Sequence, residues 1–356
     1  MKVVVVSGIW PPDVGGPASH APELADYLHA QGHEVRVVTT ADSSPAPRPY
    51  PVNWTPRRYP AGVRHFFGAG LVHRAASGAD VVYSTGMLGR SALGSRIAGV
   101  PLVQRLAGDP AYERALRRGL TSAPLDRFQQ ETGAQISVLR RTRDRALRHA
   151  GRIVVPSKAF AEIVAGWGFE AEVVPHAVSA PRLPEVARNG RTLVFAGRLV
   201  PQKALSVAFE AVRRNEAVTL LVAGDGPERA KVEAAAPVNV RFLGAQPREK
   251  VFELLHSADA TLLSSDWESF SLVAAESLAV GTPVIAAAAG GVGEVVEHEH
   301  NGLLVPPAEL ADAVHRYFSD PELRERLRGA AAESVRRLVP QEIYPRYEAI
   351  LEAVRR

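Results

Sequence analysis

The sequence predicts an α/β protein in which two doubly wound units follow one another along the chain. Its length of 356 residues, 46% of them hydrophobic, suits two domains of ordinary size rather than one. Short apolar runs, of which residues 3–6 are the first, have the β-branched character of strands buried on both faces. These runs alternate with segments of helical periodicity, and that alternation is typical of parallel α/β sheets.

Residues 3–6 are expected to form the central strand of the first unit. A loop rich in Gly and Pro follows at 9–17, and apolar residues then recur at helical spacing over 21–28 until Gly32 ends the helix. The same rhythm predicts strands at 35–39, 81–84, 102–105 and 153–156, and helices that end near 98 and 167.

Two segments of the first unit fit this rhythm poorly. Residues 41–60 contain many prolines, so we expect a long loop there. Residues 111–150 are rich in arginine, and we expect them to form helices laid over the ends of the strands.

A second α/β series begins after a break in the pattern. We interpret 177–191, which has few helix or strand signals, as a linker between a first domain at 1–176 and a second domain at 192–340. The second domain is predicted to have strands at 193–196, 220–223, 240–243, 260–264 and 283–286, with helices between them. Because Pro340 breaks the last helices, residues 341–356 are expected to cross back onto the first domain.

Composition argues against several classes of protein. The chain has no cysteine, and its histidines lack ligand spacing, so we expect no disulfide and no metal site. The apolar run at 3–6 is too short for a signal peptide, and no apolar stretch reaches the roughly 20 residues of a membrane-spanning helix. We therefore expect a cytoplasmic protein.

The formal net charge is +4, and the basic residues are concentrated from Arg114 to Arg152. This segment lacks the interleaved aromatic residues of a nucleic-acid site, so we expect no nucleic-acid partner. Two interpretations remain open. The segment is either a solvated helix surface or a contact with an acceptor or with the inner face of a membrane, which would make the protein peripheral.

One loop of the second domain carries two cations. Gly197 and Arg198 come directly after a predicted strand, and Lys203 follows five residues beyond Arg198. At a dielectric near 20, a cation about 4 Å from a phosphate oxygen gains roughly 4 kcal/mol before desolvation. The loop is a candidate diphosphate site, although a solvated surface loop would show the same spacing.

Two carboxylates, Glu268 and Glu276, stand eight residues apart around the start of a predicted helix. The amides of Ser271, Leu272 and Val273 would lie at the helix N-terminus, which favours a phosphate. Glu276 could then reach a ribose hydroxyl, while Glu268 would face a sugar. The alternatives are a first-turn acid that complements the helix dipole and a surface carboxylate.

Together these residues resemble glycosyltransferase family 4, whose members are retaining enzymes of the GT-B fold. The resemblance covers nearly the whole chain, and it implies two facing Rossmann-like domains with a cleft between them. It is carried by the order and spacing of these motifs: Trp10-Pro11-Pro12 with Gly15-Gly16, Val155-Pro156-Ser157, Gly197-Arg198 with Lys203, Gly224-Asp225-Gly226-Pro227, Phe242-Leu243-Gly244, the block 268–276, Gly281-Thr282-Pro283-Val284, Gly290-Gly291 with Glu294, and 301–305.

The resemblance implies a transferase that moves a hexose-type sugar from a nucleotide diphosphate, most readily UDP or GDP, onto an unidentified acceptor. Arg198 and Lys203 would neutralise the leaving diphosphate, Glu268 would contact the donor sugar, and Glu276 the ribose. The remaining implied substrate-binding residues are Gly15, Gly16, Gly197, Gly224, Gly244, Phe270, Ser271, Leu272 and Val273. No cofactor is implied.

The sequence departs from the family pattern near residue 109. Family members commonly carry a histidine just after the fourth strand of the first domain, whereas this region reads Gln-Arg-Leu-Ala-Gly-Asp and ends at Asp109. Asp109 would orient the acceptor or the sugar if it pointed into the cleft. A capping role before Pro110 fits equally well.

Two further absences shape the interpretation. The first loop lacks the GxGxxG fingerprint of a nicotinamide enzyme. No DxD-type pair is placed to hold a divalent cation, so we expect a metal-independent enzyme. Two other functions remain open: a nucleotide-sugar epimerase of the same fold, and a non-catalytic nucleotide-sugar-binding protein.

Overall fold

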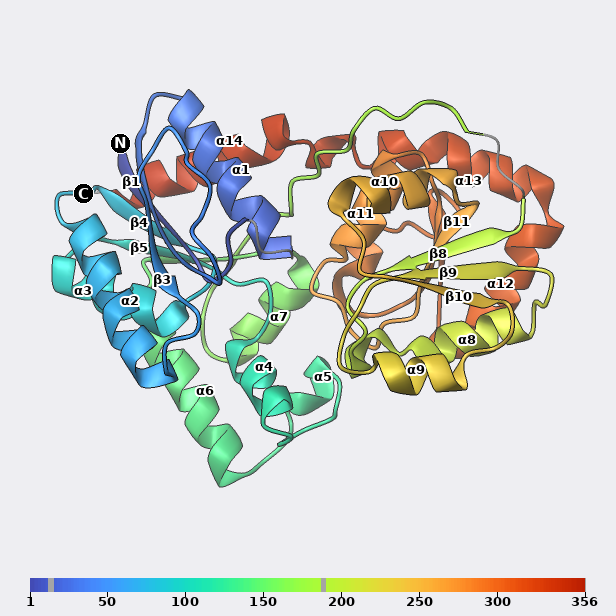
Figure 1. Ribbon diagram of the computed structural model, residues 1–356, viewed down its shortest axis with the longest axis horizontal. Helices are drawn as coiled ribbons and strands as arrows, with labels where there is room; N and C mark the ends of the chain where they lie inside the picture. The colour runs from blue at the N-terminus through green and yellow to red at the C-terminus, as the bar shows by residue number, and fades with distance from the viewer. Residues whose placement is uncertain (12–15, 187–189, 356) are drawn as a thin grey trace. The chain divides into compact units, whose positions relative to one another are not determined.

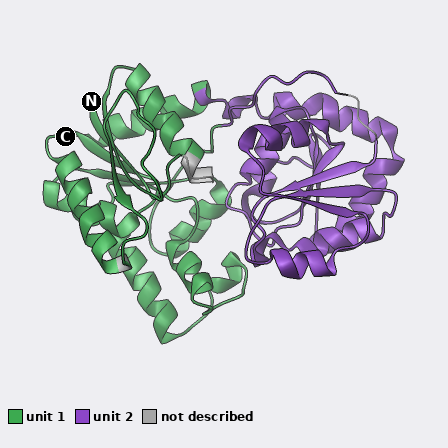
Figure 2. Ribbon diagram, in the orientation of Figure 1, with its two compact units in different colours: residues 1–177, 341–356 green, residues 178–340 purple. Residues whose placement is uncertain are grey.

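The computed structural model describes residues 1–11, 16–186 and 190–355. The chain divides into two compact units (Figure 2). Unit 1 comprises Met1–Ala177 and Gln341–Arg356, and unit 2 comprises Val178–Pro340. Val178, which the sequence left to a linker, is buried, and its N–H donates to the carbonyl of Leu338 at 2.8 Å, so the chain joins unit 2 from this residue on.

Unit 1 is built on a parallel sheet of seven strands in the order β3-β2-β1-β4-β5-β6-β7 (Figure 1). The strands are β1 (Lys2–Ser7), β2 (Glu34–Ala41), β3 (Val52–Pro56), β4 (Val81–Ser84), β5 (Leu102–Arg105), β6 (Arg152–Val155) and β7 (Glu172–Val173). The apolar run at 3–6 is fully buried in β1, next to β2 and β4, as expected for a central strand. The expectation of a loop throughout 41–60 is wrong, because this segment contains β3, an edge strand paired with β2.

The helices of unit 1 cover this sheet. They are α1 (Gly16–Ala30), α2 (Ala61–Ala76), α3 (Leu88–Ala98), α4 (Pro110–Arg117), α5 (Leu125–Phe128), α6 (Ala134–Leu147) and α7 (Lys158–Gly166). Helices α2 and α3 pack against each other. The arginine-rich segment is helical, since α4, α5 and α6 lie within it.

The last helix, α14 (Pro340–Val354), packs on unit 1 although it follows unit 2 in the chain. The Tyr344 hydroxyl donates to Glu23 at 2.8 Å, and Glu348 accepts from the Tyr27 hydroxyl at 2.7 Å. Polar contacts to α1 thus hold the end of the chain against the first half of unit 1.

Unit 2 has a parallel sheet of six strands in the order β10-β9-β8-β11-β12-β13. The strands are β8 (Thr192–Ala196), β9 (Thr219–Ala223), β10 (Val240–Gly244), β11 (Ala260–Leu263), β12 (Val284–Ala287) and β13 (Gly302–Val305). The helices are α8 (Leu205–Arg213), α9 (Arg229–Ala235), α10 (Arg248–Ser257), α11 (Leu272–Ala279), α12 (Leu310–Ser319) and α13 (Pro321–Ser334). In parallel doubly wound sheets ligands bind at the carboxyl ends of the strands, and here the ends of β10, β9, β8 and β11 are neighbours.

Within the described residues, every helix is too short or too polar to cross a membrane.

Candidate functional site

Three glycines mark the carboxyl ends of adjacent strands in unit 2. Gly197 follows β8, Gly224 follows β9, and Gly244 ends β10. Their backbones are joined, because the Gly224 N–H donates to the Gly244 carbonyl at 2.8 Å and the Gly197 N–H donates to the Ala223 carbonyl at 3.0 Å. A Cβ at residue 224 would lie 1.8 Å from the Gly197 carbonyl oxygen. Gly224 is therefore needed for the close packing of two strand-end loops, and its contact with a nucleotide stays a prediction.

The two predicted cations lie at the end of β8. Arg198 is exposed and forms no ion pair with any described residue. Lys203 ends a short 3-10 helix at Pro201–Lys203, and its side chain passes over Gly197, where an added Cβ would lie 3.6 Å from Lys203 Cε. The structure thus brings the lysine side chain next to the residue that precedes Arg198.

Lys203 is paired with Glu268 rather than free. Its ammonium group donates to Glu268 Oε1 at 2.5 Å, and the same oxygen accepts from the Ser265 hydroxyl at 2.7 Å. The Ser264 hydroxyl donates to the Lys203 carbonyl at 2.8 Å, which ties the backbone of the cation loop to the end of β11. Two residues that the sequence assigned to different parts of the donor therefore form one ion pair in the ligand-free protein.

The backbone of Glu268 is fixed by the glycine-rich turn at Gly290–Glu294. Gly291 donates its N–H to the Glu268 carbonyl at 2.8 Å. Gly290 has a φ of +56°, and a Cβ there would lie 2.3 Å from the same carbonyl oxygen. A side chain at residue 290 would collide with the Glu268 carbonyl, which explains the glycine at this position.

Helix α11 begins next to this ion pair in the chain. Ser271 is its N-cap residue, with a left-handed backbone (φ 70°) and no side-chain cap hydrogen bond. The amides of Ser271, Leu272 and Val273 donate to no described residue, and the preceding residue, Phe270, is buried. Unpaired amides at a helix N-terminus suit a phosphate, as the sequence led us to expect.

Glu276 lies in the second turn of α11 and is only 8% exposed. Its carboxylate is 3.3 Å from the guanidinium of Arg248, the first residue of α10. The interpretation as a surface carboxylate is therefore wrong. Sequence analysis missed Arg248, although its position just beyond the end of β10, at the same edge of the sheet as the loop of Arg198 and Lys203, was a signal for it.

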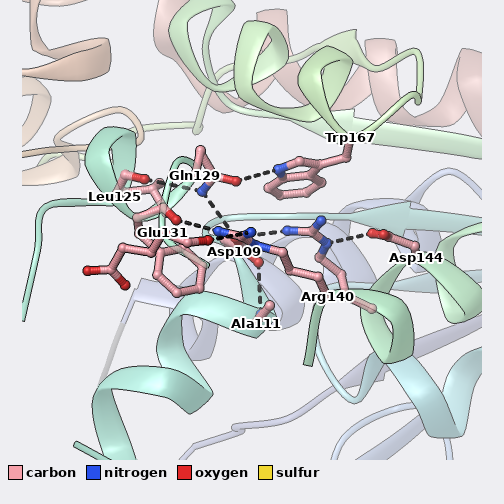
Figure 3. Close-up of polar contacts among 10 residues, drawn as sticks. Asp109, Ala111, Leu125, Gln129, Glu131, Arg140, Asp144 and Trp167 are labelled. Carbon is pink, nitrogen blue, oxygen red and sulfur yellow. Dashed lines mark hydrogen bonds and ion pairs between the residues drawn. The ribbon is translucent and has the colours of Figure 1, made fainter. Parts of the chain in front are cut away.

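Asp109 does not point into an open site. It is the N-cap of α4: one carboxylate oxygen accepts from the Ala111 N–H at 2.8 Å, and the other accepts from Arg143 at 2.9 Å and from Gln129 at 3.3 Å (Figure 3). The side chains of Asp109 and Arg143 are 0% and 2% exposed. The expectation that Asp109 orients the acceptor or the sugar is corrected, because its carboxylate is enclosed and already bonded.

Arg143 completes this enclosed cluster. Its guanidinium stacks 3.6 Å from the ring of Trp167, whose indole N–H donates to Gln129 at 2.8 Å. Part of the arginine-rich segment is therefore structural rather than a solvated surface.

The remaining predicted residues are Gly15 and Gly16. Gly15 lies outside the described residues, and Gly16 is the first residue of α1. Their role near the donor phosphates stays a prediction.

Comparisons with known proteins agree with this architecture. Residues 15–177 match the model of the glycosyl transferase 4-like domain, and residues 184–334 match the model of glycosyl transferases group 1. The chain is 30% identical to a phosphatidyl-myo-inositol mannosyltransferase of Mycobacterium leprae, over 94% of this chain and 93% of that protein. It is 28% identical to a glycogen synthase of Mycobacterium tuberculosis, over 94% and 90%.

Solved structures share the fold. Sucrose-phosphate synthase from Thermosynechococcus elongatus superposes with a TM-score of 0.80 at 20% identity, and each chain is covered to 99%. Anabaena HepE in complex with UDP and glucose superposes with a TM-score of 0.79 at 21% identity, over 99% of this chain and 100% of that chain. Two matching domain models and a full-length relative at 30% identity show the family. The chain belongs to glycosyltransferase family 4 and is a GT-B glycosyltransferase that uses a nucleotide sugar.

Proposed function

We propose that the enzyme transfers a hexose-type sugar, with retention at the anomeric carbon, from UDP or GDP onto an acceptor hydroxyl. The observation that supports this most is the group at the end of β8, where the exposed Arg198 stands beside the Lys203–Glu268 pair. A relative supports a hexose donor: the chain is 29% identical to a GDP-mannose-dependent alpha-mannosyltransferase of M. tuberculosis, over 98% of this chain.

In the proposed reaction the bond between the anomeric carbon and the diphosphate oxygen breaks, and the diphosphate leaves with the electron pair. The acceptor hydroxyl bonds to the anomeric carbon from the same face, and its proton passes to an oxygen of the departing phosphate. Arg198 and Lys203 stabilise the charge that develops on that phosphate, and the free amides of α11 bind it. The protein thus contributes position and electrostatics rather than a covalent nucleophile.

Lys203 must exchange partners in this scheme. Its ammonium group bonds to Glu268 without the donor, and a diphosphate competes for the same group. When Lys203 turns to the phosphate, the Glu268 carboxylate becomes available to a sugar hydroxyl. The partner exchange therefore couples diphosphate binding to sugar binding.

Glu276 is assigned to the nucleotide ribose, with Arg248 as its positioning partner. The ion pair with Arg248, at 3.3 Å, favours one orientation of the carboxylate, whose oxygens accept hydrogen bonds. This assignment separates the two carboxylates by function, and the separation can be measured.

The test is calorimetric titration with nucleotide alone. A thermal-shift panel of UDP, GDP and ADP and their sugars first identifies the base, because a ligand at 100 times its Kd adds roughly 2.7 kcal/mol of stability. Glu276→Ala should then weaken binding of the free nucleoside diphosphate, and Glu268→Ala should leave it unchanged while weakening the sugar donor. Glu233→Ala, on the exposed side of α9, is the matched control. Equal losses in the two variants would show that the carboxylates are wrongly assigned.

Retention is tested on the product. Once a donor is found, NMR of the first-formed glycoside reports whether the anomeric configuration of the donor is kept. An inverted product would contradict the proposed displacement.

A further inference from the structure

Unit 1 contains a cavity of about 660 Å³ at the carboxyl ends of its central strands. It is lined by residues that follow β1, β4 and β5, among them Gly8, Thr85 and Leu106. This is the edge of a parallel sheet at which α/β proteins bind ligands, and the volume suits a small organic molecule.

Arginine dominates the lining of this cavity. Six arginines line it, against a single carboxylate, that of Glu113. They are Arg57, Arg64, Arg90, Arg105, Arg114 and Arg117. They come from the segment after β3 and from α2, α3, β5 and α4, so the fold gathers them from distant parts of the sequence.

The three arginines Arg64, Arg90 and Arg114, which we call the arginine pocket, have no carboxylate partner among the described residues. Glu113 is 3.9 Å from Arg117 and is 57% exposed, and its charge favours the charged form of Arg114, so one carboxylate offsets only part of the charge of the lining. Arg64 donates one bond to the Arg57 carbonyl, at 2.6 Å. The pocket therefore carries a net positive charge.

Buried donors in the pocket lack acceptors. Arg64 Nε and Arg90 Nη1 are buried and make no hydrogen bond, and the same holds for the Thr85 hydroxyl oxygen. Buried polar groups are normally satisfied, and each exception requires an explanation such as an absent ligand. Gln104 Oε1 and Arg105 Nη1 line the same cavity and also lack a partner, so three of these five atoms belong to charged donors.

Backbone amides add to these donors. Helix α3 begins at the cavity wall, with Met87 as N-cap in the left-handed region (φ 49°) and no side-chain cap. The amides of Leu88 and Gly89 donate to no described residue, and both residues line the cavity. The end of the helix that favours anions therefore lies beside the unpaired guanidinium groups.

In the ligand-free protein, burial and mutual repulsion disfavour the positive charges of this pocket. Burial, together with the charges of Arg64 and Arg114, lowers the pKa of Arg90. Burial, together with Arg90 and Arg114, lowers the pKa of His65. Three arginines held together with one partly exposed carboxylate beside them indicate a site that an anion completes.

We propose that the arginine pocket binds a phosphate ester carried by the acceptor; the assignment of this ligand to the acceptor rests on the proposed transferase function. A phosphate monoester brings nearly two negative charges and three acceptor oxygens, which match several guanidinium forks and a helix N-terminus better than a carboxylate does. The acceptor is then a phosphorylated molecule rather than a neutral sugar.

Calorimetric titration with glycerol 3-phosphate, a minimal phosphate monoester, tests this inference, with glycerol as the neutral control. Arg90→Met and Arg64→Met keep the length of the side chain and remove the charge. Each should weaken glycerol 3-phosphate about tenfold or more, the scale of a hydrogen bond to a charged group. The matched controls are Arg96→Met on α3 and Arg74→Met on α2, both exposed and outside the cavity lining, and they should bind as the wild type does.

Folding and site assignment are checked in the same variants. Thermal unfolding shows whether each variant is folded, and titration with the nucleoside diphosphate shows whether the donor site is intact. The inference would be overturned if Arg64→Met and Arg90→Met bound glycerol 3-phosphate as tightly as the wild type. It would also be overturned if only Arg198→Ala lost affinity for glycerol 3-phosphate. Failure of every nucleotide to bind would instead refute the proposed donor site and leave the phosphate titration as it stands.

A phosphate ester could come from a soluble metabolite or from a lipid, and two exposed aromatic residues let the experiment distinguish them. Phe66 and Phe67 on α2 are 81% and 60% exposed, and they follow Arg64 in the chain. Cosedimentation with phosphatidylcholine vesicles containing phosphatidic acid, weakened by both Arg90→Met and Phe66→Ser, would assign the phosphate to a lipid. Glycerol 3-phosphate binding without cosedimentation would assign it to a soluble ester.

Discussion

The two units hold their cations in different ways. In unit 2, Lys203 is 2.5 Å from Glu268, so the lysine is neutralised in the ligand-free protein. In unit 1, Arg64, Arg90 and Arg114 line a cavity and have no carboxylate partner among the described residues. A paired cation binds an anion only by giving up its partner, whereas an unpaired cluster binds an anion directly.

This difference separates catalysis from ground-state binding. An interaction accelerates a reaction only when it is stronger in the transition state than before it. In the proposed reaction, exchange of Glu268 for a phosphate oxygen becomes more favourable as charge develops on the leaving group, so we assign the Lys203 pair to the chemical step. The arginine pocket attracts its anion equally in the ground state and in the transition state, so it suits substrate binding.

The buried pair of Asp109 and Arg143 is assigned neither to catalysis nor to substrate binding. Breaking this pair should have the largest effect on stability. Asp109→Ala removes the fully buried carboxylate from the Arg143 guanidinium, which keeps the partly exposed Asp144 at 2.8 Å. Breaking a buried pair typically costs about 3–5 kcal/mol, and because Asp144 remains we expect a loss near the lower end, about 3 kcal/mol. Urea unfolding measures the loss, and Asp126→Ala, an exposed acid on α5, should change stability little. Wild-type stability together with lost turnover would restore a catalytic role to Asp109.

The next largest effect should fall on turnover. Removal of one aimed donor that stabilises developing charge typically costs about 3 kcal/mol, or roughly 100- to 1,000-fold in kcat. Arg198→Ala and Lys203→Ala should each show such a loss with KM less affected, and the double variant should lose less than the product of the single losses. Lys231→Ala on α9, 77% exposed, is the control. If either single variant kept more than about a tenth of wild-type kcat, the loss would be far below 100-fold, and the diphosphate would have to bind elsewhere.

The sequence predicted the cations of unit 2 because they lie in continuous motifs. Lys203 is five residues from Arg198, which made the loop a candidate, and the resemblance to the family then assigned the two cations to the diphosphate. The strands were equally visible, since β-branched runs such as that of β1 are buried in parallel sheets. A proline-rich composition hid β3, because an edge strand tolerates Pro56 at its end.

The pocket of unit 1 could not be read in the same way. Its arginines are brought together only by the order of the strands, in which β4 and β5 follow β1 across the sheet. Arg143 shows the same limit, because it is 34 residues from its partner Asp109 and looked like a member of a solvated basic segment. Arg248 was missed because its partner Glu276 lies on a different helix.

Acid should destabilise the protein through two histidines of unit 1. Burial, with Arg105 as a neighbouring charge, lowers the pKa of His20 and His176 well below 6.5. The unfolded chain therefore binds more protons as the pH falls below about 6.5, and stability falls toward the folded-state pKa, by up to about 1.4 kcal/mol per pH unit and histidine. Unfolding at pH 7.5 and 5.5 measures this slope.

Replacement of one histidine should reduce that slope. His176→Phe should lose stability at both pH values because Arg105 loses a hydrogen-bond partner, but its difference between pH 7.5 and 5.5 should be smaller than that of the wild type. His315→Phe, on the surface of α12 in unit 2, is the control. An unchanged slope in His176→Phe would show that acid acts on other groups.

The smallest predicted effect is a change in stability of opposite sign in the two units, and it therefore compares them most directly. Arg90→Met removes an unpaired, partly buried charge while its alkyl chain can still lie over Gly68, where an added Cβ would be 2.6 Å from Arg90 Cδ. The ligand-free variant should therefore be more stable than the wild type by about 1 kcal/mol, the usual gain when a functional site is relieved of strain. Lys203→Met should be less stable than the wild type, because it leaves Glu268, which is 14% exposed, without its cation.

Thermal unfolding of both variants, without and with glycerol 3-phosphate, measures the sign of each change in stability. The phosphate should stabilise the wild type and Lys203→Met, and it should stabilise Arg90→Met less at the same concentration. Destabilisation of equal size in both variants would show that Arg90 is compensated in the folded protein, and the contrast between the two units would then fail.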